Sequence, residues 1–172
     1  MGLPAKLKNF GIFNDAESYI GQAAEVTIPK LGRKLESFRG AGMNGPVKVD
    51  LGMSDDGIQF EFKIGGLDLL SVRQYANASV SGVQLRFAGA YQRDDTGEVV
   101  AVEIVCRGRF KELDRGTLKA GDNTQAKVSM VNTYYKETIN GRVMHEIDLI
   151  NMVEIGPDGV DRMAEHRKAI GL

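Results

Sequence analysis

The stretch Ile58-Gln59-Phe60-Glu61-Phe62-Lys63-Ile64 decides the fold class of this chain. Apolar and polar residues alternate along it without interruption. Successive side chains of a β-strand point to opposite faces of a sheet, whereas an amphipathic helix repeats its apolar residues every three or four positions. The segment 58–64 is therefore predicted to be a strand with one buried face.

Two hairpins are predicted downstream of this strand. In the first, the apolar alternations of 85–91 and 100–110 flank a charged, glycine-containing turn. The second runs from 126 to 150 and reverses at Asn140-Gly141, a pair that suits the positive φ angles of a type I′ turn. These patterns predict a mainly β, antiparallel fold.

The segment 125–139 carries apolar residues on both faces. One face holds Val128, Met130 and Tyr134, and the other holds Val131, Tyr135 and Ile139. Two interpretations are open: a central strand buried on both sides within the chain, or a strand with one core face and one face against another subunit.

The remaining segments predict short helices and long loops in a single domain, 1–172, a usual domain length. Helical spacing of apolar residues occurs at 68–78 and again between Asp158-Gly159 and Gly171. The glycine-rich segment 30–57 shows only a brief apolar alternation around 47–51, so it is expected to be an irregular arm. A second, charged loop is expected at 111–124.

The composition argues against tight nucleic-acid binding and against a membrane protein. With 22 basic and 23 acidic residues the net charge is −1, which gives no field for gripping nucleic acid. No stretch approaches the ~20 apolar residues of a membrane span, and the first residues lack a signal-peptide core, so folding in the cytoplasm and no stable membrane association are expected. The single cysteine, Cys106, is predicted to be a buried, inert thiol.

No candidate motif predicts catalysis, cofactor binding or metal binding. Residues 40–45 match Gly-x-Gly-x-x-Gly, but the flanking residues do not predict the strand and helix that a dinucleotide site needs. His145 and His166 have no partner at metal-ligand spacing, and the paired aspartates at 55–56 and 94–95 are typical of turns. The glycine triplet is better explained as an arm tip whose backbone lies near another chain.

The chain resembles the major tail tube proteins of contractile-tailed phages and the tube protein of R-type pyocins, and the matching motifs span nearly its whole length. They are Ile28-Pro29-Lys30-Leu31, Arg33-Lys34-Leu35-Glu36, residues 39–45, Val49-Asp50-Leu51-Gly52, residues 86–98, Arg107-Gly108-Arg109, Lys111-Glu112, Glu146-Ile147-Asp148, Ile150-Asn151-Met152, and residues 159–172. Residues 65–83 match least well.

This resemblance implies an antiparallel β-sandwich or barrel-like domain that forms hexameric rings, stacked into a hollow tube for DNA passage and envelope penetration. It implies that 30–57 is the arm between subunits, with the stacking contacts made by Leu31, Arg33, Phe38, Arg39, Gly40, Gly42, Met43, Asn44, Gly45 and Leu51. Implied partners are further copies of the chain, the tail sheath protein, the tape-measure protein and the baseplate or tube-initiator proteins, with DNA only transiently in the lumen. The implied location is the virion tail, or a phage-tail-like particle, assembled in the host cytoplasm.

Two other functions fit single features of the sequence. A β-barrel enclosing a small ligand would explain the alternating strands and scattered aromatic residues. An enzyme would have to use the glycine triplet to bind a nucleotide. The sequence does not separate a phage tail from a DNA-free particle, nor does it say which face would line the lumen.

Overall fold

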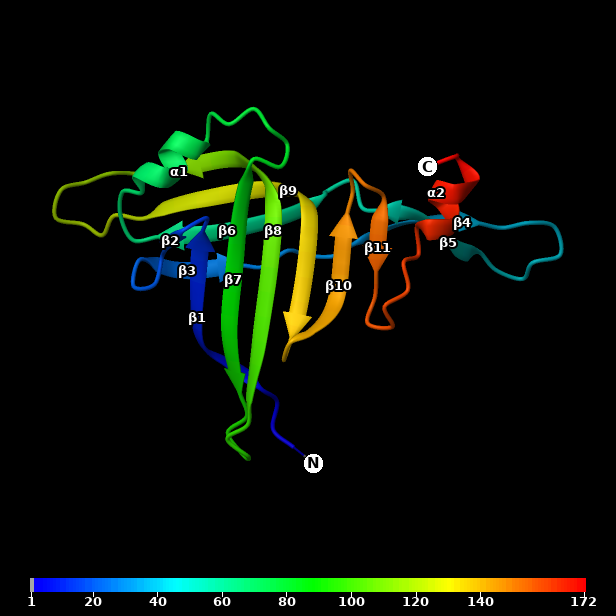
Figure 1. The fold of residues 1–172 in the computed structure, drawn as a ribbon, viewed down its shortest axis with the longest axis horizontal. Helices are drawn as coiled ribbons and strands as arrows, with labels where there is room; N and C mark the ends of the chain where they lie inside the picture. Colours follow the sequence, from blue (N-terminus) through cyan, green and yellow to red (C-terminus); the bar gives the residue numbers. More distant parts are fainter. Residues whose placement is uncertain (1) are drawn as a thin grey trace.

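A computed structural model describes residues 2–172 (Figure 1). These residues form a mainly β structure with two short helices. The elements in chain order are β1 (Lys6–Asn14), β2 (Glu17–Ser18), β3 (Ala23–Thr27), β4 (Arg33–Phe38), β5 (Val47–Met53), β6 (Ile58–Ile64), α1 (Leu69–Gln74), β7 (Val83–Gln92), β8 (Val99–Asp114), β9 (Ala126–Ile139), β10 (Arg142–Asp148), β11 (Val153–Ile155) and α2 (Ala164–Ala169).

All strand pairs are antiparallel. The two long strands β8 and β9 run through both layers of a sandwich and join them. One path of the main sheet runs β11-β10-β9-β8-β7-β1-β2, and β6 and β3 branch from β9. The first half of β9 pairs with β6 and its second half with β10, while β8 lies along its other edge. In Figure 1, β3 and β6 cross behind β1, β7 and β8 at a steep angle, as in orthogonally packed sheets.

The hydrophobic core fills the space between these layers. Ile58, Phe60, Phe62 and Ile64 are all buried, whereas the polar residues between them are half-buried, so the strand predicted at 58–64 is confirmed. The Phe62 ring stacks on Tyr19 with 5.7 Å between centroids. Other core side chains come from β1, β7, β8 and β9: Ile12, Leu85, Phe87, Ile104, Cys106, Val128 and Met130.

Both predicted hairpins are confirmed. β7 and β8 pair in continuous register from Val83↔Gly108 to Gln92↔Val99. β9 and β10 reverse at Asn140 and Gly141, whose φ angles are 49° and 79°, as a type I′ turn requires.

A bulge in β9 corrects the predicted assignment of its faces. Arg107 and Gly108 of β8 oppose Tyr134 and Asn132 of β9, so Thr133 is extra and the alternation changes sides there. Tyr135 therefore points into the core, and Tyr134 points outward, where its ring lies 4.0 Å from the Arg107 guanidinium and its hydroxyl donates to Glu146 at 2.8 Å. Placing Tyr134 with Val128 and Met130 was wrong, because the sequence pattern does not reveal a bulge. The outward residues Val131 and Tyr134 stay half-buried, so β9 is not buried on both sides within the chain.

Three boundaries differ from the predictions. Residues 111–114 belong to β8, so the second loop covers 115–125 rather than 111–124. Helix α1 is only six residues long and begins after Asp68, whose carboxylate accepts from the backbone N–H groups of Leu70 and Ser71. Helix α2 begins at Ala164 and not after Gly159, because Asp161 first bridges to Ile155; Gly171 then follows it with φ 83°.

Candidate inter-subunit interface

The predicted arm at 30–57 is a β-hairpin rather than an irregular segment. β4 and β5 form a separate two-stranded sheet with the pairs Phe38↔Val47, Glu36↔Val49 and Ser37↔Lys48. The prediction missed β4 because its apolar residues, Leu35 and Phe38, lie on opposite faces and produce no alternation. Figure 1 shows the hairpin extending past β11 and α2, away from the sandwich.

On one face of this hairpin lie Phe38, Val47 and Val49, which we call the apolar row, and Leu51 follows on the same face of β5. Directly paired residues and residues two apart along a strand share a face, so these three lie together. They are 60%, 52% and 43% exposed. An isolated two-stranded hairpin is at best marginally stable in water, so this surface favours burial against another chain.

The opposite face is mainly polar, with Leu35 as its apolar exception. Lys48 donates to the Ser37 hydroxyl at 2.7 Å, and the Arg33 guanidinium donates to Asp50 at 2.8 Å. Arg33 also reaches Glu154 of β11 at 2.8 Å, which ties the root of the hairpin to the body. Hydrogen bonds from the Gly52 N–H and from Arg33 hold the pKa of the Asp50 carboxyl below its usual value.

The tip of the hairpin, 39–46, is a closed turn. The Gly40 N–H donates to the Met43 sulfur at 3.0 Å, and the Met43 N–H donates back to the Gly40 carbonyl at 3.2 Å. Gly42 has φ +82°, where a side chain would be strained. The Gly-x-Gly-x-x-Gly match thus connects two antiparallel strands, whereas a phosphate-binding glycine motif leads from a strand into a helix N-terminus.

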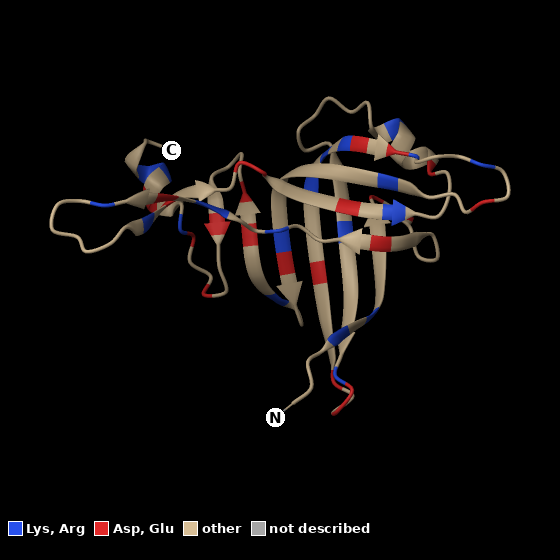
Figure 2. Cartoon of the chain, turned by 180° about the vertical axis from the view of Figure 1, so that it is seen from behind, with Lys and Arg blue, Asp and Glu red and all other residues tan. Residues whose placement is uncertain are grey.

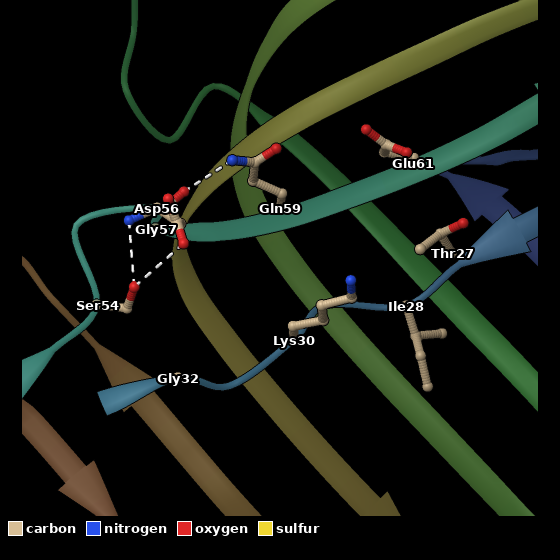
Figure 3. A pocket seen from close by; sticks show the side chains of 9 residues that line it. All are labelled: Thr27, Ile28, Lys30, Gly32, Ser54, Asp56, Gly57, Gln59 and Glu61. Atoms are coloured by element: carbon tan, nitrogen blue, oxygen red, sulfur yellow. Dashed lines mark hydrogen bonds between the residues drawn. The ribbon is translucent and has the colours of Figure 1, made fainter. Parts of the chain in front are cut away.

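A cavity of about 300 Å³ lies beside the root of the hairpin (Figure 3). The 27–32 linker, the 54–57 turn and β6 surround it, and Lys30, Ser54, Asp56 and Glu61 contribute to its lining. The Gln59 amide donates to the Asp56 carbonyl at 2.7 Å, and the Asp56 N–H donates to the Ser54 hydroxyl at 3.4 Å. The two segments that connect the hairpin to the sandwich therefore border a cavity.

The structure places all the predicted arm residues in this one hairpin or at its root. Leu31 and Arg33 lie at the root, Leu51 lies near the end of β5, and the tip or its edge holds Phe38, Arg39, Gly40, Gly42, Met43, Asn44 and Gly45. The prediction omitted Val47 and Val49, although the alternation around 47–51 already indicated a shared apolar face.

The potentially reactive groups outside the hairpin are buried or dispersed. Cys106 is fully buried, and burial raises its thiol pKa to about 12. Across residues 2–172, no three His, Cys, Asp or Glu side chains gather closely enough to hold a metal ion. Neither helix in that same range has the length and apolar character needed to cross a membrane.

The sequence profile of the family described as Phage tail tube protein FII matches residues 4–171. The chain therefore belongs to the phage tail tube protein family. It is 52% identical to the tail tube protein of Escherichia phage P2 over the full length of both chains. It is 35% identical to the major tail tube protein of Serratia phage KSP20, with 89% of this chain and 88% of that protein aligned.

Solved structures of contractile injection systems share the fold. A chain from the sheath/tube terminator of the extracellular contractile injection system PVC has a TM-score of 0.59 at 10% identity, covering 78% of this chain and 96% of that one. A chain from the anti-feeding prophage baseplate has a TM-score of 0.53 at 11% identity, covering 80% and 97%. The resemblance, the antiparallel β fold and the tail tube function expected from the sequence are confirmed.

Proposed function

We propose that this chain assembles into hexameric rings that stack into the inner tube of a contractile tail or a related particle. The observation that carries the proposal is the β4–β5 hairpin, which stands clear of its own core with the apolar row exposed. Fully burying a Val or Phe side chain contributes about 1.5–3 kcal/mol, so three such side chains supply a substantial contact between copies.

Stacking requires a contact that does not close on itself. A ring forms when one patch binds a different patch on the next copy and the rotation closes, whereas a contact along the axis repeats without end. A hairpin that projects from the body suits the second contact, and the residues from Leu31 to Leu51 would then lie between rings. The Arg33 bridge to Glu154 would hold the hairpin at a set angle.

The remaining partners follow from the family and its structural neighbours. Chains with this fold occur in a sheath–tube complex and in a baseplate, so we extend contacts with a sheath protein and with baseplate proteins to this chain. A tape-measure protein is a further partner that the sequence resemblance implies. DNA would pass through the lumen without tight binding, consistent with a net charge of −1 and with the acidic and basic residues that alternate over the sheets in Figure 2. The role is structural and not catalytic: the glycine motif forms a hairpin tip and the only cysteine is buried. Assembly would take place in the host cytoplasm.

Deletion of residues 40–46 tests the role of the hairpin. We expect the variant to keep its circular dichroism spectrum and thermal transition but to form no tubes in negative-stain micrographs. The matched control replaces the same seven positions with Gly and Ser, which keeps the length of the tip while removing its side chains. Tubes of normal length from the deletion variant would assign stacking to another segment, and an unmodified chain that stays monomeric at high concentration would overturn the proposed function.

A further inference from the structure

A narrow apolar cleft lies at the end of the molecule opposite the hairpin. It is bounded by the 115–125 loop, the residues that lead into α1 and the start of β9, and its volume is about 220 Å³. Val128 lies buried at its inner side, whereas Leu67 and Leu118 are among the most exposed apolar side chains of the chain. Small-molecule sites measure about 300–1,000 Å³, so this cleft is sized for one or two side chains rather than a ligand.

The only polar group that α1 brings to this cleft is already engaged. The Asp68 carboxylate accepts from the Tyr19 hydroxyl at 2.8 Å and from the Ser71 N–H at 3.2 Å. The cleft therefore offers an apolar lining, with the charge of Arg115 beside it.

The 115–125 loop and α1, which lie next to the cleft, are at the opposite end of the longest axis from the hairpin tip (Figure 1). A hairpin therefore cannot reach the cleft of its own chain. If one fits the other, the contact joins two copies head to tail, and each copy keeps one free hairpin and one free cleft for the next.

We propose that this cleft receives the apolar row of the β4–β5 hairpin from a second copy. The inference rests on the proposed function and names the surface that the hairpin binds. Within the apolar row, Phe38 is the side chain large enough to fill the cleft. Val47 lies beside it on the paired strand.

Charge supports the same pairing. Glu36 stands on the same face of the hairpin as Phe38, and Arg115 lies at the cleft. Within the described chain neither Glu36 nor Arg115 forms an ion pair. Seating Phe38 in the cleft brings an acidic group and a basic group to one contact, which favours this register over others.

Cysteine cross-linking tests the contact directly. Ser37→Cys and Thr117→Cys proteins, which keep Phe38 and Leu118 in place, are purified separately, mixed, assembled and treated with a short bismaleimide; the buried Cys106 does not compete. We expect covalent dimers from the mixture and none from either variant alone. Dimers from Ser37→Cys alone would mean that hairpins meet each other, and tubes without any cross-link would overturn the inference while leaving the proposed function intact.

Charge reversal provides the second test, because it keeps both surfaces folded. Glu36→Arg and Arg115→Glu are each expected to raise the concentration needed for assembly by about tenfold or more, and their combination to restore it. Lys6→Glu, in β1 and outside both the hairpin and the cleft, is the control and should leave that concentration unchanged. Normal assembly of the single variants would overturn the proposed contact. So would a double variant that does not recover assembly although its thermal transition is unchanged.

Discussion

Strands β5 and β6 follow one another in the chain and share the same alternation of apolar and polar residues, yet their environments are opposite. The apolar residues of β6 are at most 2% exposed, whereas Val47, Val49 and Leu51 of β5 are 43–54% exposed. β6 lies between β3 and β9, and β5 pairs only with β4. An alternation thus indicates which side chains share a face, but not whether that face is covered by the same chain.

The sharpest test of this contrast replaces one phenylalanine in each region. Phe60→Ala removes a fully buried ring from β6 and should lower the free energy of unfolding by about 3–5 kcal/mol, measured by urea titration. Phe38→Ala should change it by no more than about 0.5 kcal/mol and should instead reduce tube formation. Equal losses of stability from the two variants would show that the hairpin belongs to the folding core.

Two glycines extend the comparison of core and hairpin from side chains to the backbone. A Cβ on Gly108 would lie 2.0 Å from the Val131 carbonyl oxygen and 2.7 Å from the Asn132 Cα, so Gly108→Ala must displace β8 from β9 at the bulge. We expect a loss of at least about 1–3 kcal/mol in the same titration. At Gly45, in the hairpin tip, a Cβ meets nothing within 4 Å, so Gly45→Ala serves as the control and should be close to neutral. A stable Gly108→Ala variant would contradict the close approach of the two strands.

The reactivity of the Cys106 thiol measures how often the β-sandwich opens. The thiol is fully buried and its pKa is raised to about 12. In the folded protein it should therefore react with a disulfide reagent at least about a thousandfold more slowly than in the protein unfolded by urea. Phe60→Ala should speed the reaction, and Phe38→Ala should leave its rate unchanged. Acceleration by Phe38→Ala would mean that the hairpin protects the core.

The smallest expected effect is a pH response confined to the hairpin. The folded pKa of Asp50 lies below the unfolded value of about 3.9, so its contribution is present above that pH and is lost as the pH falls through the folded pKa. Hydrogen exchange of the β4 and β5 amides should be measured above the unfolded pKa and below the folded pKa of Asp50. The amides should lose protection at the lower pH. Asp50→Asn should remove this pH dependence, and an unaltered response in that variant would assign it to another group.

Much of the body could be predicted from local patterns, because a strand between two sheets shows its buried face as an alternation. The 58–64 strand, the two long hairpins and the turn at Asn140-Gly141 all followed from such patterns. The segment that holds the candidate interface was located by its glycines and by the resemblance. Its strand β4 was missed, because a strand with no covered face is under no constraint to segregate its apolar residues.

Sequence alone determined the antiparallel β class, the main strand pairs and the family of this protein, since each depends on neighbouring residues or on shared motifs. Only the tertiary structure decided that Tyr135 rather than Tyr134 enters the core, and that the hairpin and the apolar cleft lie at opposite ends of the molecule. A bulge and a long-range placement depend on contacts between residues far apart in the chain, and no local pattern records them.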